Sequence, residues 1–191
     1  MLEELKKKFG LTESQWAVFT ANVTPLDVPA KTILLQEGDV SNRIYLIEKG
    51  CIRGWFNKDS TDLTIQFFTE GETVASMESF KKQVPSLITL ETIEPCSLWL
   101  LDRGGLERLL PELDQIPVLR HQFMDRLFDR LFDYMQHFFS FIKDTPSQRY
   151  ETLLRERPQL VNRVAQHYIA SYLGISSVHL SRIKSRLLKR K

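Results

Sequence analysis

The sequence predicts an α+β fold in which an antiparallel β-region is followed by a long helix and a pair of short helices. Between Lys31 and Leu101, short segments rich in β-branched and aromatic residues alternate with turn-forming Gly, Asn and Asp. The stretch Val118–Lys143 contains no Gly or Pro and therefore favours one uninterrupted helix. Near the C-terminus, Gln166–Leu187 has two apolar helical faces separated by Gly174.

The first part is expected to begin with helix and to continue as an antiparallel sandwich or barrel, because its strands are short and evenly spaced. Residues 2–22 fit one or two amphipathic helices, and Thr12 followed by Gln15 matches a capping box. Arg103–Leu110 is expected to form a helix that ends before Pro111. The expected strands are Lys31–Gln36, Arg43–Glu48, Cys51–Asn57, Leu63–Phe68, Leu87–Ile93 and Ser97–Leu101.

The long helix carries two apolar stripes, which need two surfaces to bury against. One stripe has the alternating spacing of a coiled-coil seam and is expected to lie in a dimer interface. We expect one stripe to pack on the β-domain and the other on the same helix of a second subunit. The alternative is a helix buried inside one subunit. The seam comprises Met124, Leu127, Leu131, Tyr134, Phe138 and Phe141, and the second stripe Phe123, Phe128, Phe132, Met135, Phe139 and Ile142.

After a hinge at 144–146, a helix is expected over Ser147–Glu156, and the C-terminal pattern then predicts a helix-turn-helix. Gly174 can take the positive φ of a sharp turn, and Ser176 or Ser177 can cap the second helix. If Leu180, Ile183 and Leu187 face inward, a small and basic stripe points outward and can enter a major groove. That stripe is Val178, Ser181, Arg182, Ser185 and Lys189. The alternative is a packed helical hairpin with a solvated basic face.

Charge is distributed very unevenly along the chain. Residues 1–117 hold 12 Lys and Arg against 18 Asp and Glu, a net charge of −6, and the remainder holds 14 against 6, a net charge of +8. No acidic residue follows Glu156. A basic region around a helix-turn-helix is typical of a phosphate-binding domain.

Several function classes are disfavoured. No run of about 18 apolar residues exists to span a membrane, and the first ten residues lack the apolar core of a signal peptide. Cys51 and Cys96 fit small core residues in a reducing cytoplasm, and whether they pair is left open. There is no Gly-rich phosphate loop and no nucleophile elbow, so catalysis is not expected. All four histidines lie outside the β-region, which argues against a metal site there: His121, His137, His167 and His179.

The order of these parts resembles the cyclic-AMP receptor and fumarate-nitrate regulator (Crp/Fnr) family of bacterial transcription regulators, over essentially the whole chain. The motifs that carry the resemblance are ILLQEGD (33–39), IYLIEKGCIRGW (44–55), FFTEGE (67–72) and IASYLGISSVHLSRI (169–183). It implies a cyclic-nucleotide-binding-like β-roll sensor domain (1–117), a dimerisation helix (118–143) and a helix-turn-helix DNA-binding domain (144–191) whose wing is short or absent. The expected partners are palindromic double-stranded DNA, a second copy of the chain and RNA polymerase.

The resemblance also assigns roles to residues. Arg182 matches the family's base-contacting arginine, which can bind guanine bidentately. Ser177 and Val178 depart from the best-known members and imply a different operator. Phosphate contacts are implied for Gln166, His167, Ser176 and His179, and the expected DNA surface is completed by Ser181, Lys184, Ser185, Arg186 and Lys189.

The phosphate cassette departs from the cyclic-nucleotide binders, which carry Gly-Glu and later Arg-Ser. After Gly71 and Glu72, this chain has Ala75-Ser76 and Pro85-Ser86 at those places. Losing the arginine removes a charge-assisted bond worth about 1.5–3 kcal/mol, so cyclic AMP is an unexpected ligand. Two cysteines are too few for a four-thiolate cluster, and neither haem nor an iron–sulfur centre is expected. Two alternatives remain, a scaffold or effector-binding protein with a basic interaction tail and a cyclic-nucleotide sensor with an altered cassette.

Overall fold

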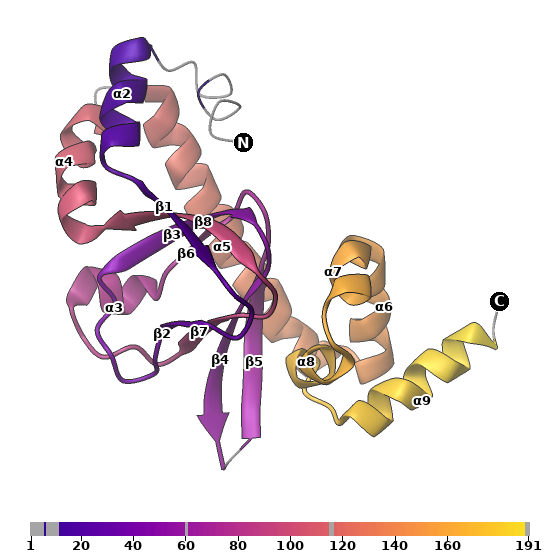
Figure 1. The fold of residues 1–191 in the computed structure, drawn as a ribbon. Coiled ribbons are helices and arrows are strands. Elements are labelled where there is room, and N and C mark those ends of the chain that lie inside the picture. The colour runs from indigo at the N-terminus through magenta and orange to yellow at the C-terminus, as the bar shows by residue number, and fades with distance from the viewer. Residues whose placement is uncertain (1–5, 7–11, 60, 115–116, 190–191) are drawn as a thin grey trace. The chain divides into compact units, whose positions relative to one another are not determined.

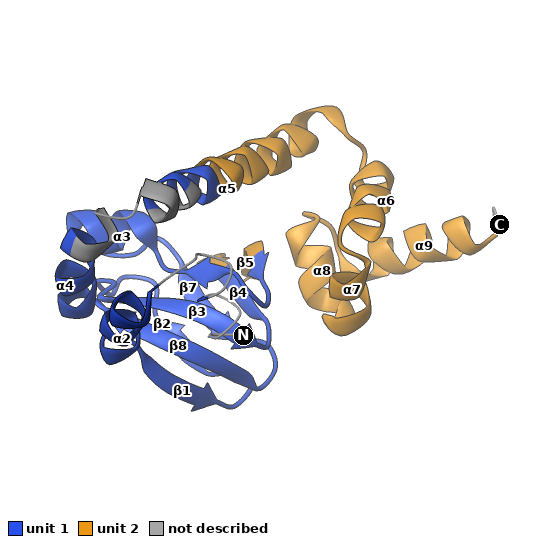
Figure 2. Cartoon of the chain, turned by 90° about the horizontal axis from the view of Figure 1, so that it is seen from above, with its two compact units in different colours: residues 1–54, 67–127 blue, residues 55–66, 128–191 orange. Residues whose placement is uncertain are grey.

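A computed structural model of the chain describes residues 6, 12–59, 61–114 and 117–189 (Figure 1). The chain divides into two compact units, coloured separately in Figure 2. The first unit comprises residues 1–54 and 67–127, and the second comprises residues 55–66 and 128–191. The second unit therefore combines the tip of a β-hairpin with the C-terminal helices. The expected division into sensor, dimerisation and DNA-binding domains, with boundaries after residues 117 and 143, concerns function and stays a prediction.

Two four-stranded sheets form the β-region (Figure 1). One has the order β1 (Thr24–Val28), β8 (Cys96–Asp102), β3 (Arg43–Lys49) and β6 (Thr73–Val74). The other has the order β2 (Ile33–Leu35), β7 (Thr89–Thr92), β4 (Ile52–Lys58) and β5 (Thr61–Phe68). The pairs β1–β8, β8–β3, β3–β6 and β2–β7 are antiparallel, as expected for a β-roll. The apolar core of this unit is Tyr45, Ile47, Ile52, Phe68, Val74, Leu90, Cys96 and Leu98.

The six expected strands correspond to β2, β3, β4, β5, β7 and β8, but two strands and one helix of the β-region were not predicted. Strand β1 contains Pro25 and Asp27, which are poor strand formers, and it pairs with β8 at the edge of its sheet. Strand β6 has only two residues, and α3 (Met77–Lys82) has no side-chain cap to indicate its start. These elements form because distant segments pack on them.

Several helices were predicted closely, and their ends follow from local chemistry. Thr12 and Gln15 form the predicted capping box of α2 (Glu13–Ala21), and Thr145 and Gln148 form another at α6 (Pro146–Glu156). Helix α5 (Pro117–Lys143) matches the predicted long helix. α8 (Gln166–Tyr172) and α9 (Ser177–Leu188) follow α6 and α7 (Pro158–Arg163).

One prediction based on proline was wrong. Helix α4 (Arg103–Asp114) continues through Pro111 instead of ending before it. The residue costs one backbone hydrogen bond, which a last turn can tolerate. Helix α7 was not predicted: Pro158 follows the end of α6 and occupies the first turn of α7, where its missing N–H has no helical partner to lose. Over the residues described, no helix combines the length and the hydropathy needed to cross a bilayer.

The first unit also buries an ion pair between neighbouring strands of the second sheet. Arg53 on β4 lies 2.8 Å through Nε and 2.7 Å through a terminal nitrogen from Oε2 of Glu91 on β7. Their side chains are 3% and 10% exposed, so the pair brings two opposite charges together largely out of contact with water.

Candidate functional site

The turn between α8 and α9 is a Schellman motif built around Gly174. This glycine has φ +67°, its N–H donates to Ser171 O at 2.9 Å, and Ile175 N–H donates to Ala170 O at 3.0 Å. The next helix begins at Ser176, whose hydroxyl accepts from His179 N–H at 3.2 Å. Ser176, one of the two predicted residues, is therefore the cap of α9.

Helix α9 has one buried and one exposed face, as its sequence pattern predicted. Leu180 and Ile183 are buried, and Leu187 is half-buried. All twelve residues expected to contact DNA are exposed: Gln166, His167, Ser176, Ser177, Val178, His179, Ser181, Arg182, Lys184, Ser185, Arg186 and Lys189. The Gln166 amide donates to Ser177 O at 3.3 Å and joins the starts of α8 and α9. The exposed polar side chains of both helix starts therefore lie together.

The exposed face is basic and carries no acidic residue. Arg182, Lys184, Arg186 and Lys189 are exposed on and after α9, and Arg163 is exposed at the end of α7. No Asp or Glu follows Glu156 in the chain. This surface has the charge and the small side chains that approach to a nucleic-acid backbone requires.

A cluster that the sequence pattern did not reveal joins the end of α5 to α6 and α8. The Arg149 guanidinium donates to Asp144 O at 2.8 Å and to Leu173 O at 2.9 Å, and its Cζ lies 4.5 Å from the centre of the Phe141 ring. The carbonyls at a helix C-terminus have no partner within the helix, and a cation there is favourable. Arg149 thereby ties two helix ends together. The only sequence feature that pointed to Arg149 was its position about one helical turn after the expected hinge.

His137 and Tyr172 stack in the same cluster. Their ring centres are 4.3 Å apart and nearly parallel, and the His137 ring meets Phe141 edge-on at 5.0 Å. Burial, together with the positive charge of Arg149, lowers the pKa of His137 to about 4, so its imidazole is neutral near pH 7. Burial raises the pKa of Tyr172 to about 12. The cluster is therefore an aromatic contact without titrating charge near neutral pH.

The seam of α5 is exposed in the single chain. Leu131 is 51% exposed and Phe138 is 63% exposed, and Met124, Leu127, Tyr134 and Phe141 are 38–43% exposed. The described members of the second stripe are exposed as well, between 44% and 70%, whereas the side chain of Phe123 lies outside the described residues. Both stripes are therefore exposed in the single chain, and the surface that covers each of them stays a prediction.

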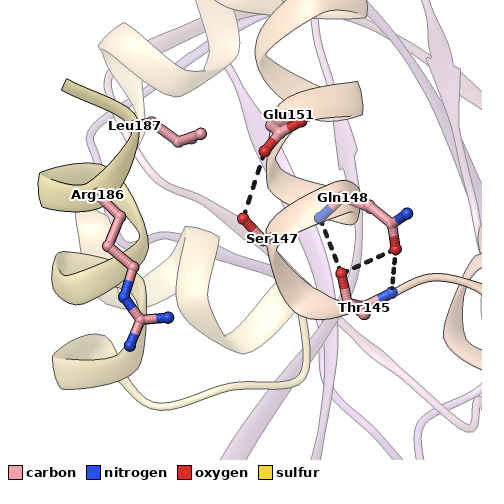
Figure 3. Close-up of a pocket in the computed structure, with 6 residues that line it drawn as sticks. All are labelled: Thr145, Ser147, Gln148, Glu151, Arg186 and Leu187. Carbon is pink, nitrogen blue, oxygen red and sulfur yellow. Dashed lines mark hydrogen bonds between the residues drawn. The ribbon is translucent and has the colours of Figure 1, made fainter. Parts of the chain in front are cut away.

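A polar pocket of about 490 Å³ lies between α6 and α9 (Figure 3). The capping box of α6 lines one side, and Figure 3 shows Leu187 directed into the space. Its lining is Thr145, Ser147, Gln148, Glu151, Arg186 and Leu187.

The cassette of the first unit satisfies its own polar groups. Glu72 accepts from Thr69 N–H at 2.6 Å and thereby closes the turn at Gly71, whose φ is +80°. The hydroxyl oxygens of Ser76 and Ser86, both buried, lie 2.9 Å apart.

The two remaining residues of the degenerate cassette, Ala75 and Pro85, carry no charge that could bind an anion. Pro85 is exposed and pairs with Val40 in an isolated bridge, and Ala75 is half-buried. The Arg126 guanidinium of α5 donates to the Gly71 carbonyl at 3.3 Å. The degenerate cassette residues are therefore used for turns and internal hydrogen bonds.

No group of three or more metal-ligating side chains occurs among the described residues. His121 and His137 lie on α5, His167 on α8 and His179 on α9. Both cysteines are buried, as predicted, Cys51 directly before β4 and Cys96 at the start of β8.

The comparisons with known proteins agree with this architecture. Residues 25–112 match the family model of the cyclic nucleotide-binding domain. No curated protein matches the sequence. Similar solved structures include the regulator CLP of Xanthomonas campestris, described as c-di-GMP responsive (20% identity, 94% of this chain and 93% of that one, TM-score 0.75).

Two further structures have the same fold. FixK2 from Bradyrhizobium japonicum is 18% identical over 88% of this chain and 85% of that one, with a TM-score of 0.71. A protein from Eubacterium rectale, described as a transcriptional regulator of the Crp/Fnr family, is 16% identical over 95% and 85%, with a TM-score of 0.68. The predicted resemblance is confirmed: residues 25–112 match the cyclic nucleotide-binding domain family, and the chain has the fold of the Crp/Fnr transcription regulators.

Proposed function

We propose that this chain is a homodimeric, sequence-specific DNA-binding transcription regulator of the Crp/Fnr type, without catalytic activity and without a response to cyclic AMP. The observation that carries the proposal is the two-sided character of α9. Leu180 and Ile183 anchor one face, and the opposite face exposes small and basic side chains. In a helix-turn-helix, such a second helix enters the major groove.

Arg182 reads guanine O6 and N7 in this proposal, and Val178, which is 62% exposed, meets a thymine methyl. Gln166 and His167 at the start of α8 and Ser176 and His179 at the start of α9 contact phosphates. The support for a shared phosphate surface is the hydrogen bond that joins the two helix starts.

Dimerisation uses the seam of α5, because its apolar side chains need a cover that the single chain does not provide. Two copies then present two α9 helices to half-sites about 34 Å apart. Residues 1–117 act as the sensor domain, 118–143 as the dimer helix and 144–191 as the DNA-binding domain.

The lack of response to cyclic AMP follows from the cassette. A cyclic phosphate would need a compensating cation, and Pro85 stands where the family's arginine would be. The buried hydroxyls of Ser76 and Ser86 are engaged with each other.

Selection from a random duplex library, followed by mobility shift over a salt series, tests the DNA proposal. A palindrome should be enriched, and affinity should fall steeply as salt rises. Arg182→Ala should cost about 10–100-fold and relax the choice of one base pair per half-site. Lys81→Ala, which removes one positive charge from an exposed position on α3, is the matched control and should change little. Sequence-blind or absent binding would instead favour the scaffold with a basic interaction tail.

Calorimetry tests the proposal that the chain does not respond to cyclic AMP. The family match at residues 25–112 gives the altered-cassette sensor its support, so cyclic AMP and cyclic GMP are both needed. Cyclic di-GMP belongs in the series because the regulator CLP is described as responsive to it. Saturable binding of cyclic AMP at micromolar concentration would refute the proposal that the altered cassette does not bind this nucleotide.

A further inference from the structure

Strand β5 lies at the edge of its sheet, and the first part of it shares the second compact unit with α8 (Figure 2). The Ser171 hydroxyl of α8 donates to Asp62 O at 2.7 Å and accepts from Thr64 N–H at 2.9 Å. Residues two apart on a strand direct their backbone groups to the same side. One hydroxyl therefore satisfies two neighbouring backbone groups of an edge strand. We call this contact the hairpin latch.

One of the two latch partners, Thr64, is buried, whereas Asp62 is exposed. Thr64 is 4% exposed, and its own side-chain oxygen is buried without a hydrogen-bond partner. Water is therefore a poor substitute for Ser171 at this backbone N–H, because a buried donor must find a partner within the protein. The Ser171 hydroxyl joins α8 to the backbone of Thr64 and Asp62, which lie 107 and 109 positions earlier in the sequence.

Fixing α8 also fixes α9. The Schellman turn at Gly174, the buried Leu180 and Ile183, and the bond from Gln166 to Ser177 O join the two helices. Arg182 and the rest of the outward stripe are exposed while Ser171 is engaged. The latch therefore leaves the basic face of α9 open.

We propose that Ser171 is a positioning residue, which holds the α8–α9 pair on the β4–β5 hairpin so that two copies can engage two half-sites together. The inference rests on the proposed function. A palindrome requires both α9 helices at a fixed spacing, and a loosely held pair loses orientational freedom on binding. A single half-site makes no such demand on the pair.

Three variants test the latch, each first shown to be folded by far-UV circular dichroism. Ser171→Ala removes the hydroxyl, Ser171→Thr keeps it, and Thr64→Val is the matched control because it leaves the backbone N–H in place. Hydrogen exchange at the Thr64 amide reports the latch directly. In Ser171→Ala this amide should exchange at least about tenfold faster, because its acceptor is lost. Ser171→Thr and Thr64→Val should exchange like the wild type.

DNA binding separates positioning from a local defect. Ser171→Ala should bind the selected palindrome about tenfold more weakly, as expected for two lost hydrogen bonds, while its affinity for a duplex with one half-site stays within about twofold of the wild type. Ser171→Thr should restore palindrome affinity. Wild-type exchange and palindrome affinity in Ser171→Ala would overturn the latch, and an equal loss on the single half-site would overturn the positioning role. If the wild type binds no duplex, the proposed function and the positioning role fall together, while the exchange rates still decide whether the hydroxyl holds the hairpin.

Discussion

Replacing Gly174 with Ala should destabilise the second unit by about 2–5 kcal/mol, the sum of two separate costs. A non-glycine residue at φ +67° costs about 1–2 kcal/mol. The added Cβ would also lie 2.8 Å from Cε1 of Phe141, closer than real Cβ contacts allow. That ring cannot retreat freely, because Arg149 and His137 pack on it. Overpacking of this kind costs about 1–3 kcal/mol.

Urea unfolding followed by far-UV circular dichroism measures the cost. Gly71→Ala is the matched control, because Gly71 has φ +80° but nothing within 4 Å of its Cβ position, so only the backbone cost of about 1–2 kcal/mol applies. The double variant Gly174→Ala/Phe141→Leu should recover the contact cost and keep the backbone cost. The reasoning is refuted if Gly174→Ala costs no more than Gly71→Ala, or if the double variant recovers nothing.

Three further predictions concern other parts of the molecule. Arg53→Met should destabilise the first unit by about 3–5 kcal/mol because it strands the buried Glu91 carboxylate, and Arg53→Met/Glu91→Leu should recover most of that loss in urea unfolding. The folded-state pKa of His137 is about 4, below the value of 6.5 for a free imidazole, so its contribution to stability is complete above pH 6.5 and is lost as pH falls toward 4. We expect the free energy of unfolding to fall by about 1–2 kcal/mol over this range, a value discounted because the ring is only half-buried. The wild type and His179→Gln should show this loss, and His137→Phe should not. An equal dependence of stability on pH in all three proteins would contradict the prediction. Leu131→Glu, which places like charges across the α5 seam, should raise the dimer dissociation constant by about 100-fold or more in sedimentation velocity, while Gln136→Glu outside both stripes should leave it unchanged.

Local chemistry let the sequence alone determine much of this protein. The two faces of α9 follow from a 3.6-residue period, the turn at Gly174 from its freedom at positive φ, and the capping boxes at Thr12 and Thr145 from partners three residues away. Short strands and turn residues predicted an antiparallel sandwich or barrel, and the resemblance to the Crp/Fnr family implied that it is a β-roll. The caps, the turn and the helix faces depend on residues a few positions apart, so a linear pattern reveals them.

The tertiary structure decided whatever depends on partners far apart in the chain. Strand β1 exists because β8 pairs with it despite Pro25, and Arg53 can be buried because Glu91 lies on a neighbouring strand. The sequence assigned Phe141 only to the seam of α5, yet its ring also contacts Arg149 and faces Gly174. Ser171 gave no signal at all, since its two partners lie on an edge strand more than a hundred residues earlier. A side chain's period shows which face it occupies, but only the folded chain brings to that face the distant backbone or charge that completes the contact.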